Sequence, residues 1–391
     1  MKQSLLAPCL LTAAIACASS VQAADIRFNG FASVVAGKTL SEGTSRGRLT
    51  GLESDSTYTA DSPTEGVYDD DISFKPDTVF GLQISADLGQ NLSVTGQFTG
   101  SGGEDFDANV AWAYISYDFN EYWNLQAGRQ RLPLFFYSDF LDVAYAYHWI
   151  RVPQDLPAAF NDTFEGVKFG YTNSNDNWDW RFDLYGGATS SDVQGVDIEM
   201  KKILGGVAKI SNDWLQLRAS YMQTDINSKE VLGLTYRGEL QLTDDNPLAY
   251  EFAGVAAHAT LGNGFLVGEY TVSRVGDPLG PDNDVDGFDN NVGWYVSYGH
   301  RFGDFTPHIT YSAQVNEYSD ELPSLSSTAE DESTTWTLGV RWDFHPSAAF
   351  KVEYASRDHN VDNVIENVVG GFGDGNEREV DIVSAGFDII F

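Results

Sequence analysis

The sequence predicts an all-β protein: a transmembrane antiparallel β-barrel of about sixteen strands, with short turns on one rim and long loops on the other. Three observations carry this prediction. Apolar and polar residues alternate, short and long connections alternate, and aromatic residues gather near the short connections. Of the 391 residues, 42% are hydrophobic, which argues against intrinsic disorder. The chain has 23 Lys+Arg against 57 Asp+Glu, and this acidic balance excludes nucleic acid as a natural partner, because phosphate binding requires clustered basic residues.

The first element has the pattern of a secretory signal peptide. Lys2 gives a positive start, residues 5–16 form an apolar run, and Val21-Gln22-Ala23 is a small-residue cleavage pattern. We therefore divide the chain into a signal peptide, residues 1–23, and one barrel domain, residues 24–391.

Both cysteines, Cys9 and Cys17, lie in the signal segment, so the mature chain is expected to contain no disulfide and no thiolate metal site. Lipidation of Cys17 is a competing interpretation, but Ala14 stands where the lipidation pattern usually has Leu. After Ala24, no uncharged apolar stretch reaches the roughly 20 residues of a membrane helix. An exported chain without such a helix is either a soluble protein or a membrane β-barrel. The periodicity of apolar and polar residues distinguishes the two.

Alternation over the last nine residues identifies the final strand. Residues 383, 385, 387, 389 and 391 are apolar, and the positions between them include Ser384, Gly386 and Asp388. Because successive side chains of a strand face opposite sides, one face is apolar and the other is polar or small. Similar segments define sixteen predicted strands, at residues 25–37, 74–88, 92–100, 108–119, 124–133, 163–172, 178–188, 202–211, 214–225, 249–261, 265–274, 291–302, 305–317, 333–344, 348–357 and 379–391. An extra hairpin within 226–248 would raise the number to eighteen.

The connections and the aromatic residues favour a membrane barrel over a soluble sandwich. Turns of two or three residues alternate with long acidic connections, at about 41–71, 134–160, 275–290, 318–332 and 358–378. Aromatic side chains cluster where strands meet the short turns, as expected of a girdle at the lipid–water interface. These residues are Phe119, Tyr122, Trp123, Trp178, Trp214, Phe302, Phe305, Trp342, Phe344 and Phe391.

With its signal peptide, sixteen alternating segments, turn-side aromatics and terminal Phe391, the whole mature chain resembles the Gram-negative trimeric porins. The resemblance implies a homotrimeric outer-membrane channel, surrounded by lipid and lipopolysaccharide, for passive diffusion of small hydrophilic solutes and ions. It implies no cofactor and no catalysis. It also implies that Phe391 is part of the signal read by the barrel-assembly machinery, a signal that many other barrels share.

Residues 128–151 resemble porin strand five running into the third loop, which in that family folds inward and narrows the channel. The Pro-Glu-Phe-Gly-Gly sequence of enterobacterial porins is absent, which leaves the width of the pore open. Rings of charge determine ion preference in such pores. A charged residue facing lipid costs roughly 2–4 kcal/mol at the midplane, so the alternation predicts that wall bases face the lumen. The candidate constriction consists of Arg27, Arg129, Arg131 and Lys168 on the wall, and Asp139 and Asp142 on the loop. The alternative is that these are solvated lumen residues or ion pairs that anchor the loop.

The same loop is rich in aromatic residues, which either form a stacking lane for solutes or fasten the loop to the barrel wall. We favour fastening. The aromatic residues are Phe135, Phe136, Tyr137, Phe140, Tyr145, Tyr147 and Trp149.

Asp282, Asp284 and Asp286 match the opening of a calcium-binding loop, but Gly293 stands where the bidentate Glu belongs. We therefore regard this segment primarily as an acidic surface loop, and only as a weak candidate for a metal site.

Two other classes of function are open. A barrel enzyme would need a catalytic constellation, but the six histidines are scattered and no Gly-x-Ser-x-Gly element occurs. An adhesin or receptor would carry its function on the long loops and have a plugged lumen.

For a channel, the acidic loops predict a modest cation preference. Residues 41–72 hold eight acids against two arginines, and residues 277–289 hold five acids and no base.

Overall fold

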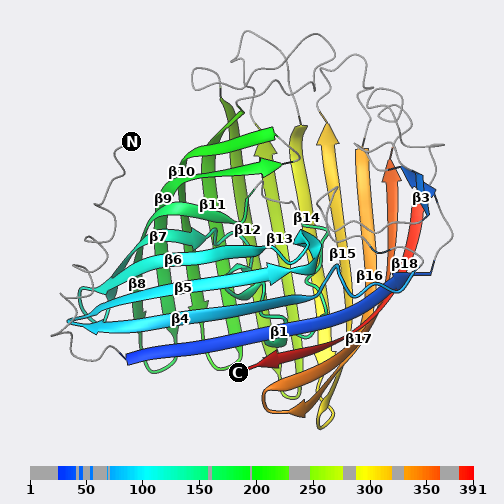
Figure 1. The fold of residues 1–391 in the computed structure, drawn as a ribbon, viewed down its shortest axis with the longest axis horizontal. Helices are drawn as coiled ribbons and strands as arrows, with labels where there is room; N and C mark the ends of the chain where they lie inside the picture. The colour runs from blue at the N-terminus through cyan, green and yellow to red at the C-terminus, as the bar shows by residue number, and fades with distance from the viewer. Residues whose placement is uncertain are drawn as a thin grey trace, which may run out of the picture.

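The computed structural model describes residues 25–40, 44–46, 53–55, 68, 71–156, 161–193, 196–228, 247–275, 288–318, 330–361 and 378–391. In this part of the chain, sixteen antiparallel strands close into one barrel (Figure 1). None of the described helices is long and apolar enough to cross a membrane. The predicted signal peptide and the candidate calcium ligands Asp282, Asp284 and Asp286 lie outside the described residues.

All sixteen predicted strands are present, with ends that differ by a few residues. The barrel strands are β1 (Asp25–Thr39), β4 (Val79–Gly89), β5 (Leu92–Ser101), β6 (Ala108–Asp118), β7 (Trp123–Arg131), β8 (Thr163–Ser174), β9 (Asp179–Val193), β10 (Val196–Ser211), β11 (Leu215–Ser228), β12 (Leu248–Leu261), β13 (Gly264–Val275), β14 (Phe288–His300), β15 (Phe305–Tyr318), β16 (Glu330–His345), β17 (Ala348–Val361) and β18 (Arg378–Ile390). A separate two-stranded ribbon joins β2 (Thr44–Arg46) to β3 (Glu53–Asp55). Because β11 pairs directly with β12, the barrel has sixteen strands rather than eighteen.

The outer face of the barrel is apolar, as the alternation predicts. On β18, Phe387 and Ile389 are exposed, whereas Ser384 and Asp388, which occupy the alternate positions of the strand, are buried toward the inside. The same contrast separates exposed Val352 from buried Lys351 on β17. An exposed apolar belt of this extent is unfavourable in water and matches a lipid-facing surface. Most of the predicted girdle residues are exposed on this surface, and pairs such as Phe305 and Trp342 stack across neighbouring strands with ring centroids 5.7 Å apart.

The barrel closes where the last strand meets the first. β18 pairs with β1, and the terminal residue continues the ladder, since Phe391 N donates to Gly30 O (2.9 Å) and Gly30 N donates to Phe391 O (2.7 Å). The Phe391 ring covers Gly30 so closely that a Cβ at that position would lie 2.3 Å from it. The absence of a side chain at position 30 therefore makes room for the terminal ring.

We expect Phe391→Ala to lower the amount of assembled barrel in the outer membrane, because it removes both the terminal apolar side chain and the ring that covers Gly30. The amount of assembled barrel is measured in outer-membrane fractions by its heat-modifiable mobility on gels. Phe302→Ala is the matched control, since Phe302 is also an exposed phenylalanine near a short turn. Normal yield of Phe391→Ala would contradict the expectation.

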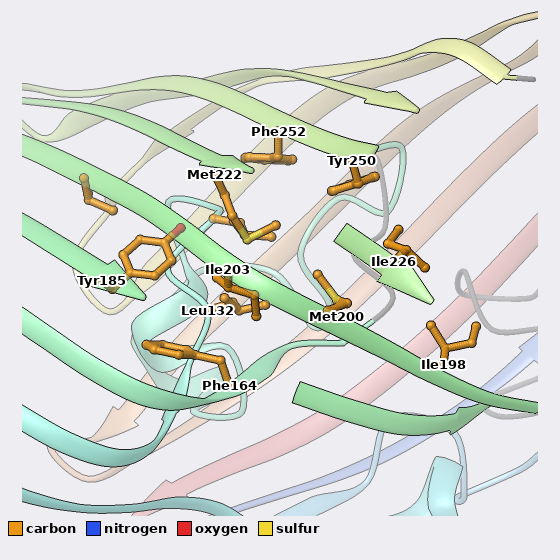
Figure 2. Close-up of a cluster of buried hydrophobic side chains, with 12 residues drawn as sticks. Leu132, Phe164, Tyr185, Ile198, Met200, Ile203, Met222, Ile226, Tyr250 and Phe252 are labelled. Carbon is orange, nitrogen blue, oxygen red and sulfur yellow. The ribbon is translucent and has the colours of Figure 1, made fainter. Parts of the chain in front are cut away.

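Part of the barrel interior is apolar, which the alternation does not predict. Twelve buried side chains from β8–β12 and from the chain just after β7 form one cluster inside the barrel (Figure 2). They are Leu132, Leu134, Phe164, Tyr185, Ile198, Met200, Ile203, Val207, Met222, Ile226, Tyr250 and Phe252. A bulge in β10 between Lys201 and Leu204 shifts the alternation, so that Met200 and Ile203 both face inward. This apolar cluster fills one side of the interior and supports the loop that follows β7.

Candidate pore constriction

The connection between β7 and β8, residues 132–162, is called loop 3 here, and its described residues, 132–156 and 161–162, fold into the barrel. It contains two short 3-10 turns, η2 (Ser138–Phe140) and η3 (Ala144–Ala146). Its described residues make hydrogen bonds to strands from β11 to β17, far from its own ends in the sequence. Loop 3 is therefore attached to the wall opposite β4–β7.

The first attachment is at the start of loop 3. Arg218 of β11 donates to the carbonyl oxygens of Pro133 and Leu134, the latter at 2.6 Å, and Ser220 donates to Leu134 at 2.6 Å. Glu269 of β13 accepts a 2.8 Å hydrogen bond from the Phe136 backbone N–H. These partners satisfy loop backbone groups that would otherwise be buried without a hydrogen bond.

A second attachment involves a buried histidine and a tryptophan. His148 shares a 2.9 Å hydrogen bond with Ser297, and the Trp149 indole N–H donates to Thr310 at 2.7 Å. Burial, with nearby His308 as a further cause, holds the pKa of His148 well below its usual range, so its ring is neutral. Ser297 is fully buried. A substrate therefore cannot reach this Ser–His pair, as it would have to if Ser297 were a nucleophile and His148 its base.

A third attachment holds the middle of loop 3 to β16–β18. The Lys351 ammonium donates to the carbonyl oxygens of Ala144 (2.7 Å) and Trp149 (2.5 Å) and pairs with Asp388 (2.7 Å). Glu353 accepts from the Ile150 N–H. Arg341 donates to two more loop carbonyl oxygens, at 2.6 and 2.7 Å. Lys351 and Asp388 are almost fully buried, so this ion pair is shielded from solvent screening.

The end of loop 3 is attached through its charged residues. Asp155 accepts from Ser312 (2.6 Å) and Ser333 (2.7 Å), and Arg151 pairs with Asp77, which precedes β4. Asp77 also accepts a 2.6 Å hydrogen bond from Tyr68. Burial raises the pKa of Asp77, but the Arg151 guanidinium and the hydrogen bonds outweigh it, and the pKa ends below its usual range.

The aromatic residues of loop 3 mostly pack against the wall. Phe136, Tyr137, Tyr147 and Trp149 are buried, and Trp149 meets Tyr295 of β14 edge to face with ring centroids 5.6 Å apart. This burial agrees with the fastening interpretation, because a stacking lane would need ring faces open to solutes.

Arg131 and Asp142, two of the predicted constriction residues, pair with each other. The Arg131 guanidinium lies 2.5 Å from Asp142 and 3.3 Å from Asp162. Burial raises the pKa of Asp142 in spite of the neighbouring Arg131. This pair ties loop 3 to the end of β7, as the anchoring alternative describes.

Arg129 and Arg27 form no described ion pair with the loop acids, although Arg129 lines the cavity beside loop 3. Arg129 pairs with Glu165 on β8 at 2.6 Å, and the register puts the two directly opposite each other, next to the outward-facing pair Ala127 and Val167. Arg27 lies near the start of β1, opposite Ser85. In the described part of the chain, no ion pair of loop 3 includes Arg27 or Arg129.

Asp139 and Lys168, in contrast, belong to one charged cluster. Asp139, on η2, forms an ion pair with Lys209 of β10 and interacts electrostatically with Lys168 and Arg218. Burial raises the pKa of Asp139, but these bases outweigh it and the pKa ends below its usual range. Asp139 is therefore a carboxylate near neutral pH.

The sequence prediction missed three basic residues of this cluster: Arg181, Lys209 and Arg218. Arg181 lies directly opposite Lys209, and Lys209 directly opposite Arg218, on β9, β10 and β11. Together with Lys168 of β8, whose cross-strand partner on β9 is Tyr185 rather than Arg181, these bases are called the basic ladder. Each occupies a polar position of an alternating strand, so the alternation contains the signal that would have identified them.

A cavity of about 500 Å³ lies beside loop 3. It is lined by loop residues and by residues of β4–β7, including Thr99, Asn109 and Ala111. The lumen wall on this side carries uncharged polar groups, as in the 3.2 Å hydrogen bond from Gln97 to Gln83. Space therefore remains between loop 3 and strands β4–β7.

Comparison with known proteins identifies the architecture. No family model and no curated protein matches the sequence. Solved structures match over almost the whole chain. OmpTΔL8, a loop L8 deletion mutant of OmpT, an outer membrane protein of Vibrio cholerae, has a TM-score of 0.59 and 12% identity, covering 95% of this chain and 100% of that one. The outer membrane channel DcaP of Acinetobacter baumannii has a TM-score of 0.57 and 12% identity, covering 95% and 99%. OmpF of Salmonella typhi, in a complex with daunomycin, has a TM-score of 0.54 and 13% identity, covering 94% and 97%.

This chain has the porin fold. It is an outer-membrane barrel that crosses the membrane with sixteen strands, and its third long connection folds inward. In this barrel, Arg181, Lys209 and Arg218 are consecutive cross-strand partners on β9–β11, and the loop acid Asp139 pairs with Lys209.

Proposed function

We propose that the protein is a passive channel for small hydrophilic solutes and ions. One observation carries this proposal: loop 3 makes most of its attachments to β11–β17, and a cavity of about 500 Å³ remains between the loop and β4–β7. A loop held in this way narrows a lumen without plugging it, which favours a channel over a plugged receptor. Conduction through such a pore needs neither a cofactor nor catalytic residues.

The proposed assembly is a homotrimer in the outer membrane, in contact with lipid and lipopolysaccharide and inserted by the barrel-assembly machinery. One matched structure is described as the trimer form of Vibrio cholerae OmpT, which supports this part of the proposal. His148 and His308 lie buried beside each other within the loop attachment, so neither offers an exposed base to a catalytic alternative.

Planar-bilayer recording of the refolded protein tests the channel. We expect stepwise ohmic conductance in simple salt, and no hydrolysis of lipid or peptide by the same preparation. Inserted protein that gives no conductance steps, or a preparation that hydrolyses peptides, would contradict the proposal.

The third prediction concerns ion preference. The long connections carry many of the acids behind the net charge of −34, and such a mouth concentrates cations. The basic ladder opposes this preference at the constriction. Because the field of the exposed acids is screened over about 10 Å at 0.1 M salt, we expect a modest cation preference that weakens as salt rises. Reversal potentials across a salt gradient measure it, and anion preference at both low and high salt would contradict it.

A further inference from the structure

We propose that the lumen face of β4–β7 is a binding site for uncharged sugars that pass through the channel. This inference rests on the proposed channel function and names a class of solute that the pore holds on its way. The site combines side-chain amides with aromatic rings, and we call it the amide wall. Its residues are Gln83, Gln97, Trp112, Tyr114, Gln126 and Gln130.

The register of the strands gathers these residues on one patch. Gln83, Gln97 and Trp112 are consecutive cross-strand partners on β4, β5 and β6. Directly opposite residues of an antiparallel pair have Cβ atoms about 5 Å apart, so the three side chains form one row. Tyr114 is two residues from Trp112 on the same strand, and their ring centroids are 6.3 Å apart. Two amides and two aromatic rings are therefore neighbours.

The amide wall faces the lumen. Val94 on β5 and Ile115 on β6 are exposed on the outer face, whereas Gln97 and Tyr114, at alternate positions of the same strands, are buried and half-buried. Asp139 of η2 acts electrostatically on Tyr114, so this ring lies near loop 3. A solute that passes between loop 3 and β4–β7 therefore meets the amide wall.

The protein uses only part of the hydrogen-bonding capacity of this wall. Gln97 donates to Gln83 at 3.2 Å, but a primary amide has two N–H donors and an oxygen with two lone pairs, so both amides keep capacity. In the part of the chain that the structure describes, Gln126 Oε1, both polar atoms of Gln130 and Trp112 Nε1 are buried without a hydrogen-bond partner. Buried polar groups normally have partners, so these atoms point to a ligand rich in donors and acceptors. A hydroxyl is both, and it pairs with either end of an amide.

The amide wall is uncharged, and bases stand only at its edges. Arg27 lies at the β1 edge, and Lys168 lies at the β8 edge, opposite Gln126. The cross-strand row that begins at Arg27 continues through the uncharged residues Ser85, Thr95, Tyr114 and Gly128. A wall of this kind offers amide and hydroxyl groups in place of ion pairs, so it favours solutes whose polar groups are hydroxyls.

The rings of Trp112 and Tyr114 supply the apolar half of a sugar site. A pyranose ring has a face of C–H groups that packs on an aromatic ring, while the hydroxyls at its edge reach polar side chains. Tyr114 lies opposite Gly128, and Gly128 lies opposite Gly166, so the wall beside the Tyr114 ring carries no side chain. This strip leaves room for a flat solute.

The amide wall continues the cavity beside loop 3. Thr99 of β5 and Ala111 of β6 line that cavity, and Gln97 and Trp112 follow them on the same strands toward the short turns. The cavity volume of about 500 Å³ lies within the range of small-molecule sites. A sugar that leaves the cavity toward the short turns therefore moves along the amide wall.

The test is block of the ionic current by maltose in planar bilayers, with polyethylene glycol of the same hydrodynamic radius as the size control. We expect maltose to reduce the current at concentrations where the glycol does not, because the glycol lacks the rim of hydroxyls. Trp112→Leu removes the flat ring, and the double variant Gln83→Leu/Gln97→Leu removes two amides. Each should raise the half-blocking concentration of maltose about tenfold.

Trp123→Leu and Gln223→Leu are the matched controls, since both residues are exposed on the outer face of the barrel. They should leave the block by maltose unchanged. Equal block by maltose and by the glycol would overturn the inference, and so would equal block of the wild-type protein and both amide-wall variants.

Calorimetric titration with maltose reads binding without conduction, provided that the barrel is solubilised in an amine-oxide detergent, which carries no sugar. A protein that conducts ions but neither binds maltose nor is blocked by it would overturn the inference and leave the channel intact. Maltose binding that is lost in Trp112→Leu, in a protein that carries no current, would uphold the amide wall and refute the channel.

Discussion

Removing the inward part of loop 3 will raise the single-channel conductance several-fold. The change replaces residues 136–150 by a short Gly–Ser linker, which takes out the segment attached to Lys351, Glu353 and Ser297. Conductance is limited by the narrowest part of the path, and in the proposed channel that part is the cavity between loop 3 and β4–β7. Single-channel recording of the refolded variant measures the effect.

The control for this excision is a deletion of residues 231–242, within the long connection between β11 and β12, which leaves loop 3 intact. It should change the conductance little. A correctly inserted loop 3 variant with unchanged conductance would mean that the loop does not limit the current.

The second large effect is expected from Lys351→Met. The change leaves Asp388 buried without its cation and two loop carbonyl oxygens without a donor. Loss of one partner of a buried ion pair costs about 3–5 kcal/mol. We therefore expect a lower free energy of unfolding, measured by urea titration in vesicles, together with noisier open-channel current as the loop loosens.

The double variant Lys351→Met/Asp388→Leu distinguishes the contribution of the ion pair to stability from the contribution of the loop attachment to a quiet current. Replacing both charges by apolar side chains removes the uncompensated carboxylate, so much of the lost stability should return. The current should stay noisy, because the carbonyl oxygens of Ala144 and Trp149 still lack their donor. A quiet channel in both variants would show that other contacts hold loop 3 in place.

The barrel could be predicted from the sequence because a lipid-facing strand has a local signature. In residues 383–391, every second residue is apolar, and the structure exposes Phe387 and Ile389 on the outer face. Period-two alternation can be recognised from neighbouring residues alone, without knowing which residues are in contact in the fold. The number of strands and their order followed from it.

The loop attachments could not be predicted in the same way. Lys351 and Glu353 could be placed on the lumen face by alternation, but their partners Ala144 and Ile150 lie about 200 residues away in the sequence. The apolar cluster was hidden for another reason: the bulge at Lys201–Leu204 shifts the alternation within β10.

The apolar cluster inside the barrel bears on how the sheet curls. Its twelve side chains face away from lipid, so before closure their alternative surroundings are water rather than acyl chains. The hydrophobic effect therefore favours bringing β8–β12 around Leu132 and Leu134, whereas it gives no such drive between lipid-facing residues that stay in lipid. Burial of these side chains can therefore curve the β8–β12 half of the sheet. The gap that must be closed between β1 and β18 then becomes shorter.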